Sequence, residues 1–327
     1  MGNNSPHNVK NYERQGFMNS KIKILAVALV ASSALSMCSF TARAESAPTE
    51  IIETRSATAL FTRYELTTSK VYNKNISAYS KLSLTQNGKR LNSDVRIING
   101  IPYVALRSFM DEIGGMTVTY YSKTKTLNVR GAGFEMDAID GSNVIYANGR
   151  VIFSMTPSTI MTNGRMYAPL DSVCKALGLT PKLNQNSTEV SVTGKVTPIK
   201  HGSTYYDADA VYWLSRIISA ESRGESLLGQ IMVGNVVLNR VKSSLYPNTI
   251  WGVIFDRKYG VQFSPIIDGS IYQTPTASAV VAAKICLEGF VVNNESLFFL
   301  YPKHSTSSWI PNNREYLFSI GKHDFYA

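Results

Sequence analysis

A glutamate that continues an apolar stripe is the first residue in this sequence whose position suggests chemistry. Val211, Leu214 and Ile218 recur at the spacing of one face of an α-helix, and Glu221 continues that face. Because the stripe is apolar, we expect it to be buried and the Glu221 carboxyl to be partly removed from water. Desolvation raises the pKa of a carboxyl group, which is what a general acid needs at neutral pH. The alternative is a structural glutamate that caps the helix or pairs with an arginine.

Two further carboxylates, Glu225 and Asp268, are candidates to work with Glu221. Glu225 lies one helical turn later, but the intervening glycine leaves the direction of its side chain open. A salt bridge at the junction of two helices is the alternative role for Glu225. Arg223 and Arg240 are the basic residues with which Glu221 itself would pair in the structural alternative. The pattern alone does not choose between an assisted acid and an acid that works alone.

The segment 227–242 is apolar nearly all round, which predicts a buried helix with Ser226 as its N-cap. Gln230, Asn235 and Asn239 interrupt this apolar surface. Buried amides need hydrogen-bond partners. These three therefore either bond neighbouring backbone or line a polar cleft, and the sequence leaves both readings open.

A loop-rich stretch follows, in which aromatic residues alternate with polar ones: Gln262, Phe263, Ser264, Asp268 and Tyr272. This mixture suits a sugar-binding groove, because sugar rings present C–H faces to aromatic rings and hydroxyl edges to polar groups. An ordinary packed loop is the alternative. Thr274 and Pro275 then take the N-cap and N1 positions of a third predicted helix, which ends at Gly289.

Residues 80–194 contain an internal repeat with an offset of 64 residues. Each copy has an Asn-Gly pair followed by Tyr, Leu and a closing Gly, at 99–114 and again at 163–178. Asn-Gly between alternating apolar residues predicts a β-hairpin. The segments 106–113 and 170–177 predict short helices closed by a glycine. Two strand-hairpin-helix-strand units of this size predict a compact α+β domain.

The first 44 residues have the layout of a secretory signal peptide. Two lysines precede an apolar run at 24–35, and Ala42 and Ala44 are the small residues that a signal peptidase recognises. Met18 is an alternative start, and Cys38 gives a faint likeness to a lipoprotein cleavage site. An uncleaved membrane anchor is the remaining alternative. We expect an exported protein that keeps no membrane span after cleavage.

Composition supports folded domains, since 44% of the residues are hydrophobic and 17% are charged. We divide the chain into a signal peptide, a Ser/Thr/Ala-rich tether, the repeat domain, a polar linker and a mainly helical domain. Their ranges are 1–44, 45–79, 80–194, 195–206 and 207–327. The predicted fold class is therefore α+β with two domains.

The formal net charge of +10 attracts polyanions, among them the bacterial wall and nucleic acid. The sequence has no basic run interleaved with aromatics, so we do not expect a nucleic-acid partner. Cys174 and Cys286 lie among apolar residues and predict buried free thiols, with a disulfide as the alternative in an oxidising compartment. No Cys and His residues have the spacing of metal ligands, so we expect no metal and no cofactor.

Several short motifs occur in order through the C-terminal domain. They are Ala220-Glu221-Ser222-Arg223-Gly224-Glu225, Gly229-Gln230, Val237-Leu238-Asn239-Arg240-Val241, Gln262-Phe263-Ser264-Pro265, Asp268-Gly269 and Gly321-x-His323-x-Phe325. Together they resemble the SleB-type spore cortex-lytic cell wall hydrolase domain. Ser222 departs from an alanine common in that family, and the segment 303–308 has no counterpart in it. The resemblance implies a lysozyme- or transglycosylase-like domain with Glu221 as the essential acid.

The same resemblance implies that peptidoglycan, commonly that of the spore cortex during germination, is the substrate. It places the protein in the cell wall, the spore cortex region or the extracellular space. The residues expected to bind substrate are Glu225, Gln230, Asn239, Gln262, Phe263, Ser264, Asp268, Tyr272 and His323.

The expected reaction is cleavage between N-acetylmuramic acid and N-acetylglucosamine, with Glu221 first as acid and then as base of a lytic transglycosylase. A hydrolytic muramidase would need a second carboxylate, Asp268 or Glu225. An N-acetylmuramoyl amidase would need zinc, which His304 and His323 alone do not bind. A non-catalytic wall-binding protein is the fourth alternative.

The repeat domain resembles the copper amine oxidase N-terminal-like domain through its Asn-Gly-x-x-Tyr-Val-x-Leu-Arg pattern at 99–107. Ala105 replaces a proline that this pattern usually has, whereas Pro169 keeps it in the second copy. The domain has no apparent copper ligands. The resemblance implies an accessory module that binds the cell wall or a protein partner, with a simple spacer as the alternative. We therefore expect residues 200–327 to cut soluble glycan fragments without it.

Overall fold

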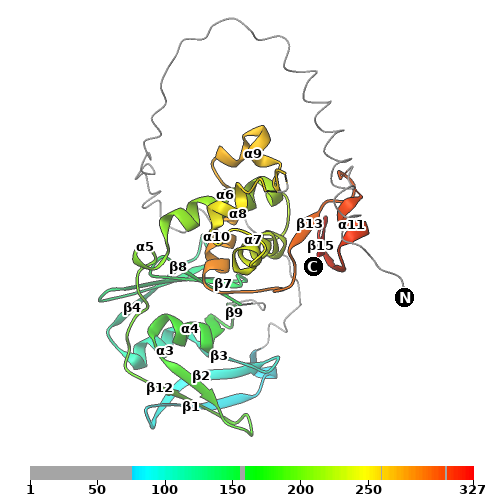
Figure 1. Cartoon of the computed structure of the whole chain (residues 1–327). Coiled ribbons are helices and arrows are strands. Elements are labelled where there is room, and N and C mark those ends of the chain that lie inside the picture. The colour runs from blue at the N-terminus through cyan, green and yellow to red at the C-terminus, as the bar shows by residue number, and fades with distance from the viewer. Residues whose placement is uncertain (1–75, 155–158, 259, 306–307) are drawn as a thin grey trace, which may run out of the picture. The chain divides into compact units, whose positions relative to one another are not determined.

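The structure is a computed structural model that describes residues 76–154, 159–258, 260–305 and 308–327 (Figure 1). All of them belong to the second of two compact units into which the chain divides, Glu50–Ala327. The predicted signal peptide and nearly all of the predicted tether lie outside the described residues. No helix within the described ranges is long and apolar enough to cross a membrane.

The N-terminal region is rich in strands and holds two sheets. The seven-stranded sheet has the order β11-β12-β1-β2-β3-β10-β9, and the five-stranded sheet runs from β4 to β8 in sequence order. After a short η1 (Ile76–Ala78), the strands of the first sheet are β1 (Lys81–Gln86), β2 (Lys89–Ile98), β3 (Ile101–Ala105), β9 (Ile160–Thr162), β10 (Arg165–Pro169), β11 (Thr180–Leu183) and β12 (Glu189–Thr193). Those of the second are β4 (Met116–Tyr121), β5 (Thr126–Gly131), β6 (Phe134–Ile139), β7 (Val144–Ala147) and β8 (Arg150–Phe153).

The sequence repeat is a structural repeat. Helices α3 (Leu106–Ile113) and α4 (Leu170–Leu177) span the predicted segments, and both pack against the seven-stranded sheet (Figure 1). The two copies meet within that sheet, where β3 pairs antiparallel with β10. The Asn-Gly pairs are tight turns as predicted: Asn99 and Asn163 have φ near +50°, a conformation that asparagine and glycine adopt more easily than other residues.

The C-terminal region is built around three helices that contact one another, α6 (Ala208–Ser222), α7 (Leu227–Lys242) and α10 (Ala277–Leu287). Its smaller elements are α5 (Gly202–Tyr205), α8 (Ile250–Ile254), α9 (Pro265–Asp268), η2 (Ser270–Tyr272), β13 (Phe298–Leu300), α11 (Trp309–Asn313), β14 (Tyr316–Ile320) and β15 (His323–Tyr326). Strands β13, β15 and β14 form a small antiparallel sheet. A strand-rich first part followed by a helical part confirms the predicted α+β class.

The two predicted N-caps differ in outcome. Ser226 caps α7 as predicted, because its hydroxyl accepts a hydrogen bond from the Gly229 amide. The third predicted helix begins later than expected: its N-cap is Thr276, whose hydroxyl accepts from the Ala279 amide at 3.2 Å, and not Thr274. The Thr276 amide also donates to Ser219 Oγ, so a contact with α6 fixes the start of α10.

The predicted linker 195–206 forms backbone hydrogen bonds with the N-terminal region. Thr197 and Ile199 donate their amides to carbonyls at the end of α4, and Gly202 donates to the Asn148 carbonyl. Val144 and Val151 of β7 and β8 also belong to the same apolar core as the three helices. The two regions thus share part of one core.

Candidate active site

Glu221 is the penultimate residue of α6, at the end of the apolar face that the sequence predicts. Leu214 and Ile218 on that face are fully buried, whereas Val211 is half-buried. The helix ends because Ser222 bonds back to the Ile218 carbonyl and Arg223 is the C-cap before Gly224. This ending leaves the Glu221 side chain at the edge of the core, half-buried.

The pKa of Glu221 is raised to about 7, first by burial and then by the negative charge of Asp268. The positive charge of Arg240 opposes this shift without cancelling it. Within the described residues the Glu221 carboxyl makes no hydrogen bond and no ion pair. Arg240 donates to the Leu297 carbonyl, and Arg223 donates to the Ser219 carbonyl and to Gln273 Oε1. A structural pairing with either arginine is therefore absent from this part of the chain.

Arg240 lies close enough to Glu221 for their charges to act on each other. It is almost fully buried on α7, and its Nη1 has no hydrogen-bond partner in the structure. Burial lowers the pKa of this guanidinium from its usual very high value, and the nearby acidic groups oppose the shift. A buried cation beside an acid stabilises the ionised form of that acid.

Asp268 faces solvent at the end of α9. Its Oδ1 accepts a hydrogen bond of 2.8 Å from the Ser270 amide. The Ser270 side chain first, and this amide second, hold the pKa of the carboxyl below its usual range. Gly269, with φ of 77°, makes the left-handed turn that allows this contact. At neutral pH the site therefore combines an ionised Asp268 with a carboxyl at Glu221 that is about half protonated.

Glu225 is engaged by the hairpin at the end of the chain. Its Oε2 accepts the Lys322 amide at 3.1 Å, in the turn between β14 and β15. Gly321 in that turn has φ of 60°, and a Cβ there would collide with the same oxygen. Among the described residues Glu225 has no salt bridge. Glu225 thus joins the α6–α7 junction to a distant hairpin.

The amides of α7 bond mainly to backbone, which is one of the two readings left open by the sequence. Asn235 and Asn239 donate to carbonyls of the segment 290–296 and hold it against the helix. Gln230 donates to the Glu225 carbonyl at 3.0 Å, while its Oε1 is buried without a partner. Of these three amides, only Gln230 has a buried polar atom without a hydrogen-bond partner.

The remaining predicted substrate-binding residues divide between core and surface. Phe263 and His323 are buried, and the His323 ring packs against Phe299 at 5.4 Å. Burial lowers the pKa of His323, so it is neutral at physiological pH. Gln262 is half-buried and bonds to the Gly260 carbonyl. Ser264 is exposed at the start of α9, and Tyr272 is 61% exposed.

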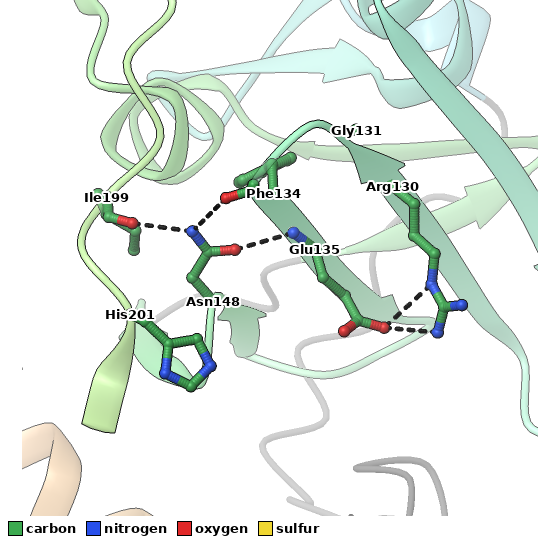
Figure 2. Close-up of a pocket in the computed structure, with 8 residues that line it drawn as sticks. Arg130, Gly131, Phe134, Glu135, Asn148, Ile199 and His201 are labelled. Carbon is green, nitrogen blue, oxygen red and sulfur yellow. Dashed lines mark hydrogen bonds and ion pairs between the residues drawn. The ribbon is translucent and has the colours of Figure 1, made fainter. Parts of the chain in front are cut away.

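A hollow of about 660 Å³ lies away from Glu221, between β5, β6 and the segment 199–201 (Figure 2). Asn148 spans it by accepting from the Glu135 amide and donating to the carbonyls of Gly133 and Ile199. The carboxylate that lines it, Glu135, is exposed and paired with Arg130 at 2.7 Å. A solvated, paired carboxylate does not make a general acid, so the hollow is not where the chemistry belongs.

The two cysteines of the described residues form no disulfide. Cys174 and Cys286 are buried free thiols, as the sequence predicts, and burial raises the pKa of each to about 12. Within the described ranges, no group of three or more His, Cys, Asp or Glu side chains is arranged to hold a metal ion.

Two family models match the chain. Residues 224–326 match Cell Wall Hydrolase, and residues 85–192 match the Copper amine oxidase N-terminal domain. Glu221 lies just before the first of these matched ranges. The two resemblances predicted from the sequence are thereby confirmed.

Curated relatives match part of the chain. The chain is 38% identical to the spore cortex-lytic enzyme of Bacillus cereus over 120 residues, 37% of this chain and 45% of the relative. It is 37% identical to that of Bacillus subtilis over 112 residues, 34% of this chain and 35% of the relative. The chain thus spans less than half the length of these relatives.

Among solved structures, the catalytic domain of the germination-specific lytic transglycosylase SleB of Bacillus anthracis is 36% identical. The match covers 39% of this chain and all of that domain, with a TM-score of 0.35.

Proposed function

We propose that this chain, which carries a cell wall hydrolase domain, is a lytic transglycosylase that cleaves peptidoglycan glycan strands between N-acetylmuramic acid and N-acetylglucosamine. The observation that carries the proposal is the Glu221 carboxyl, which is desolvated, has a pKa raised to about 7 and has no hydrogen-bond or ion-pair partner among the described residues. A carboxyl in this state donates a proton near neutral pH and afterwards takes one back. Relatives named spore cortex-lytic enzymes support spore cortex peptidoglycan as the substrate.

In the first step, protonated Glu221 donates its proton to the oxygen of the glycosidic bond. The bond to the muramic C1 breaks with its electron pair going to the leaving N-acetylglucosamine, and positive charge develops on the muramic ring. The ionised Asp268 stabilises that charge, because it lies near enough to act on Glu221. Arg240 stabilises the Glu221 carboxylate that the step creates.

In the second step, the Glu221 carboxylate takes the proton of the muramic C6 hydroxyl, whose oxygen bonds to C1. The product is a 1,6-anhydro ring, and Glu221 returns to its protonated form without a water molecule entering the reaction. Glu225 takes no part in either step, because its carboxylate is held by the Lys322 amide.

A hydrolytic muramidase is the second candidate, and one observation favours it: Asp268 is an ionised carboxylate that acts electrostatically on Glu221. With Asp268 as base or nucleophile, water would add to C1 and leave a new reducing end. Asp268 is exposed to solvent whereas Glu221 is desolvated, and for this reason we place this reaction second.

The test is the product of digestion. We expect purified cortex peptidoglycan treated with the full exported chain to give anhydromuramic ends by mass spectrometry. New reducing ends would show that the protein is a hydrolytic muramidase instead. Free amines would identify an amidase, and the absence of any product would identify a non-catalytic wall-binding protein. Glu221→Gln keeps the shape but cannot donate a proton, so we expect a loss of roughly 10²–10⁴-fold in rate. Near-normal activity of this variant would exclude Glu221 as the acid.

A further inference from the structure

We propose that a row of four aromatic rings, centred on the helix that carries Glu221, binds glycan units beyond the bond that is cleaved, which rests on the proposed function. The row consists of Tyr272 in η2, Trp213 in α6, Phe255 at the end of α8, and Trp251 in α8. We call it the aromatic row. Both η2 and α8 pack against α6, so residues distant in sequence come together on the helix that carries Glu221.

The four rings form one continuous series of contacts. Trp213 is at its centre, 6.4 Å from Tyr272 and 5.2 Å from Phe255 between ring centroids, and both contacts are edge to face. Phe255 in turn stacks on Trp251 at 5.1 Å. These contacts hold each ring in place, so a ligand that stacks on them needs to order few side chains.

The two ends of the row face solvent although they are large and apolar. Tyr272 is 61% exposed and Trp251 is 55% exposed, while Trp213 and Phe255 between them are half-buried. Exposed aromatic rings that adjoin one another mark a binding surface more often than scattered single ones do. Aromatic faces attract the C–H faces of sugar rings, whereas the polar edges of the sugars stay hydrated.

The row reaches the elements that flank Glu221. In the sequence, Tyr272 lies between Asp268 and Gln273. The charge of Asp268 acts on Glu221, and Gln273 accepts a hydrogen bond of 3.2 Å from Arg223. From Tyr272 the rings lead to Trp213, eight residues before Glu221 on the same helix. A glycan strand whose scissile bond meets Glu221 therefore has the aromatic row as its next contact on this side. A peptide bound to the aromatic row would not need to reach Glu221, so the position of the row favours a glycan as its ligand.

The experiment measures binding against glycan length. Peptidoglycan is freed of stem peptides and fractionated into strands of defined length. The full exported chain carries Glu221→Gln so that the strands survive, and Trp309→Phe so that both remaining tryptophans belong to the row. Fluorescence then reports on the row itself. We expect Trp251→Ala and Tyr272→Ala each to weaken binding of long strands by roughly 3- to 10-fold, with little change for the shortest strand that is cleaved. In Trp251→Ala the fluorescence of Trp213 reports the binding.

Two further variants serve as controls. Trp251→Phe keeps a ring and should retain most of the affinity, whereas Tyr316→Ala removes an aromatic residue that is 52% exposed outside the row and should change nothing. Equal affinity of the row variants and their parent at every length would overturn the proposal, and so would an equal loss at every length. If the row variants lose affinity for long strands but the chain with Glu221 intact cleaves nothing, the aromatic row is still a glycan-binding surface, whereas the proposed function is wrong.

Discussion

The ionisation of Glu221 sets the pH range of the proposed reaction. Only the protonated form begins it, and its pKa is raised to about 7. We therefore expect the rate on soluble glycan fragments to fall as pH rises through about 7. We expect no loss of rate near pH 4 of the kind that protonation of a carboxylate nucleophile would cause. Asp268→Asn removes one cause of the raised pKa, so it should move the alkaline limb to lower pH. Initial rates across pH measure both, with folding checked at each pH.

A two-carboxylate muramidase would behave differently in the same measurement. It would give a bell-shaped profile, because a second carboxylate must be ionised while Glu221 is protonated. An acidic limb that disappears in Asp268→Asn, with activity left over, would contradict the single-acid mechanism and identify the partner.

The raised pKa of Glu221 also predicts a cost in stability. The folded state holds the proton up to about pH 7, whereas the unfolded chain releases it near 4.5. Stability that comes from the protonated form is complete below pH 4.5 and is lost as pH rises through 7. Glu221→Gln removes this loss, so at pH 8 we expect the free energy of unfolding of the variant to exceed that of wild type by about 1–3 kcal/mol, and the variant to unfold at a higher temperature. The two should be alike at pH 4; a Gln variant that is less stable at both pH values would argue that the carboxyl has a bonded, structural role.

At the scale of elements, the hairpin of β14 and β15 depends on Glu225. Gly321→Ala introduces a side chain at positive φ and displaces the Glu225 carboxylate from the Lys322 amide. We expect a loss of about 2–3 kcal/mol, part from backbone strain and part from the hydrogen bond. Urea denaturation measures the free energy of unfolding.

Gly269→Ala is the matched control for this substitution. Gly269 has φ of 77° with open space around the Cβ position, so it should show the backbone cost alone, about 1 kcal/mol. In a Glu225→Ala background, Gly321→Ala should likewise cost only that amount. An unchanged cost in this background would mean that Glu225 does not hold the turn.

At the scale of the whole described chain, a buried ion cluster joins the strand-rich region to the helices. Glu288 accepts hydrogen bonds from Arg150 on β8 and from Tyr206, and Lys175 lies 3.3 Å away. Burial acts to raise the pKa of Glu288, but the hydrogen bonds from Arg150 and Tyr206 outweigh it and the pKa is lowered. This stabilisation is therefore present above the carboxyl's ordinary pKa and is lost as pH falls through the lowered one.

Arg150→Met tests the coupling of the two regions. It leaves a buried carboxylate without its main partner, so we expect a loss of about 3–5 kcal/mol in unfolding free energy at pH 7. Arg130→Met is the control, because its pair with Glu135 is exposed on both sides and should contribute less than about 1 kcal/mol. Similar small losses for both variants would show that the cluster does not connect the regions.

The same cluster changes what we expect of the fragment 200–327. That fragment lacks Arg150, Lys175, Val144 and Val151, which pair with Glu288 or pack in the helical core. It keeps Glu221 and Asp268, so its chemistry should survive wherever it folds. We expect a lower melting temperature than the full chain and activity only below that temperature.

The sequence alone determined the local structure and singled out Glu221 as the candidate acid. The Asn-Gly turns, α3, α4 and the helix that carries Glu221 follow from short-range rules of spacing and backbone conformation, and the structure has all of them. Those rules do not depend on distant residues. The start of α10 was predicted wrongly for the opposite reason, since a contact with Ser219 on α6 decides it.

Only the tertiary structure decided which groups meet around Glu221. Asp268 and Arg240 act on Glu221 from other elements, Glu225 turns to a hairpin almost a hundred residues away, and the aromatic row assembles from three elements. A pKa and a binding surface depend on distances in space and on exclusion of water. Residue types and spacing along the chain fix neither of these until the chain has folded.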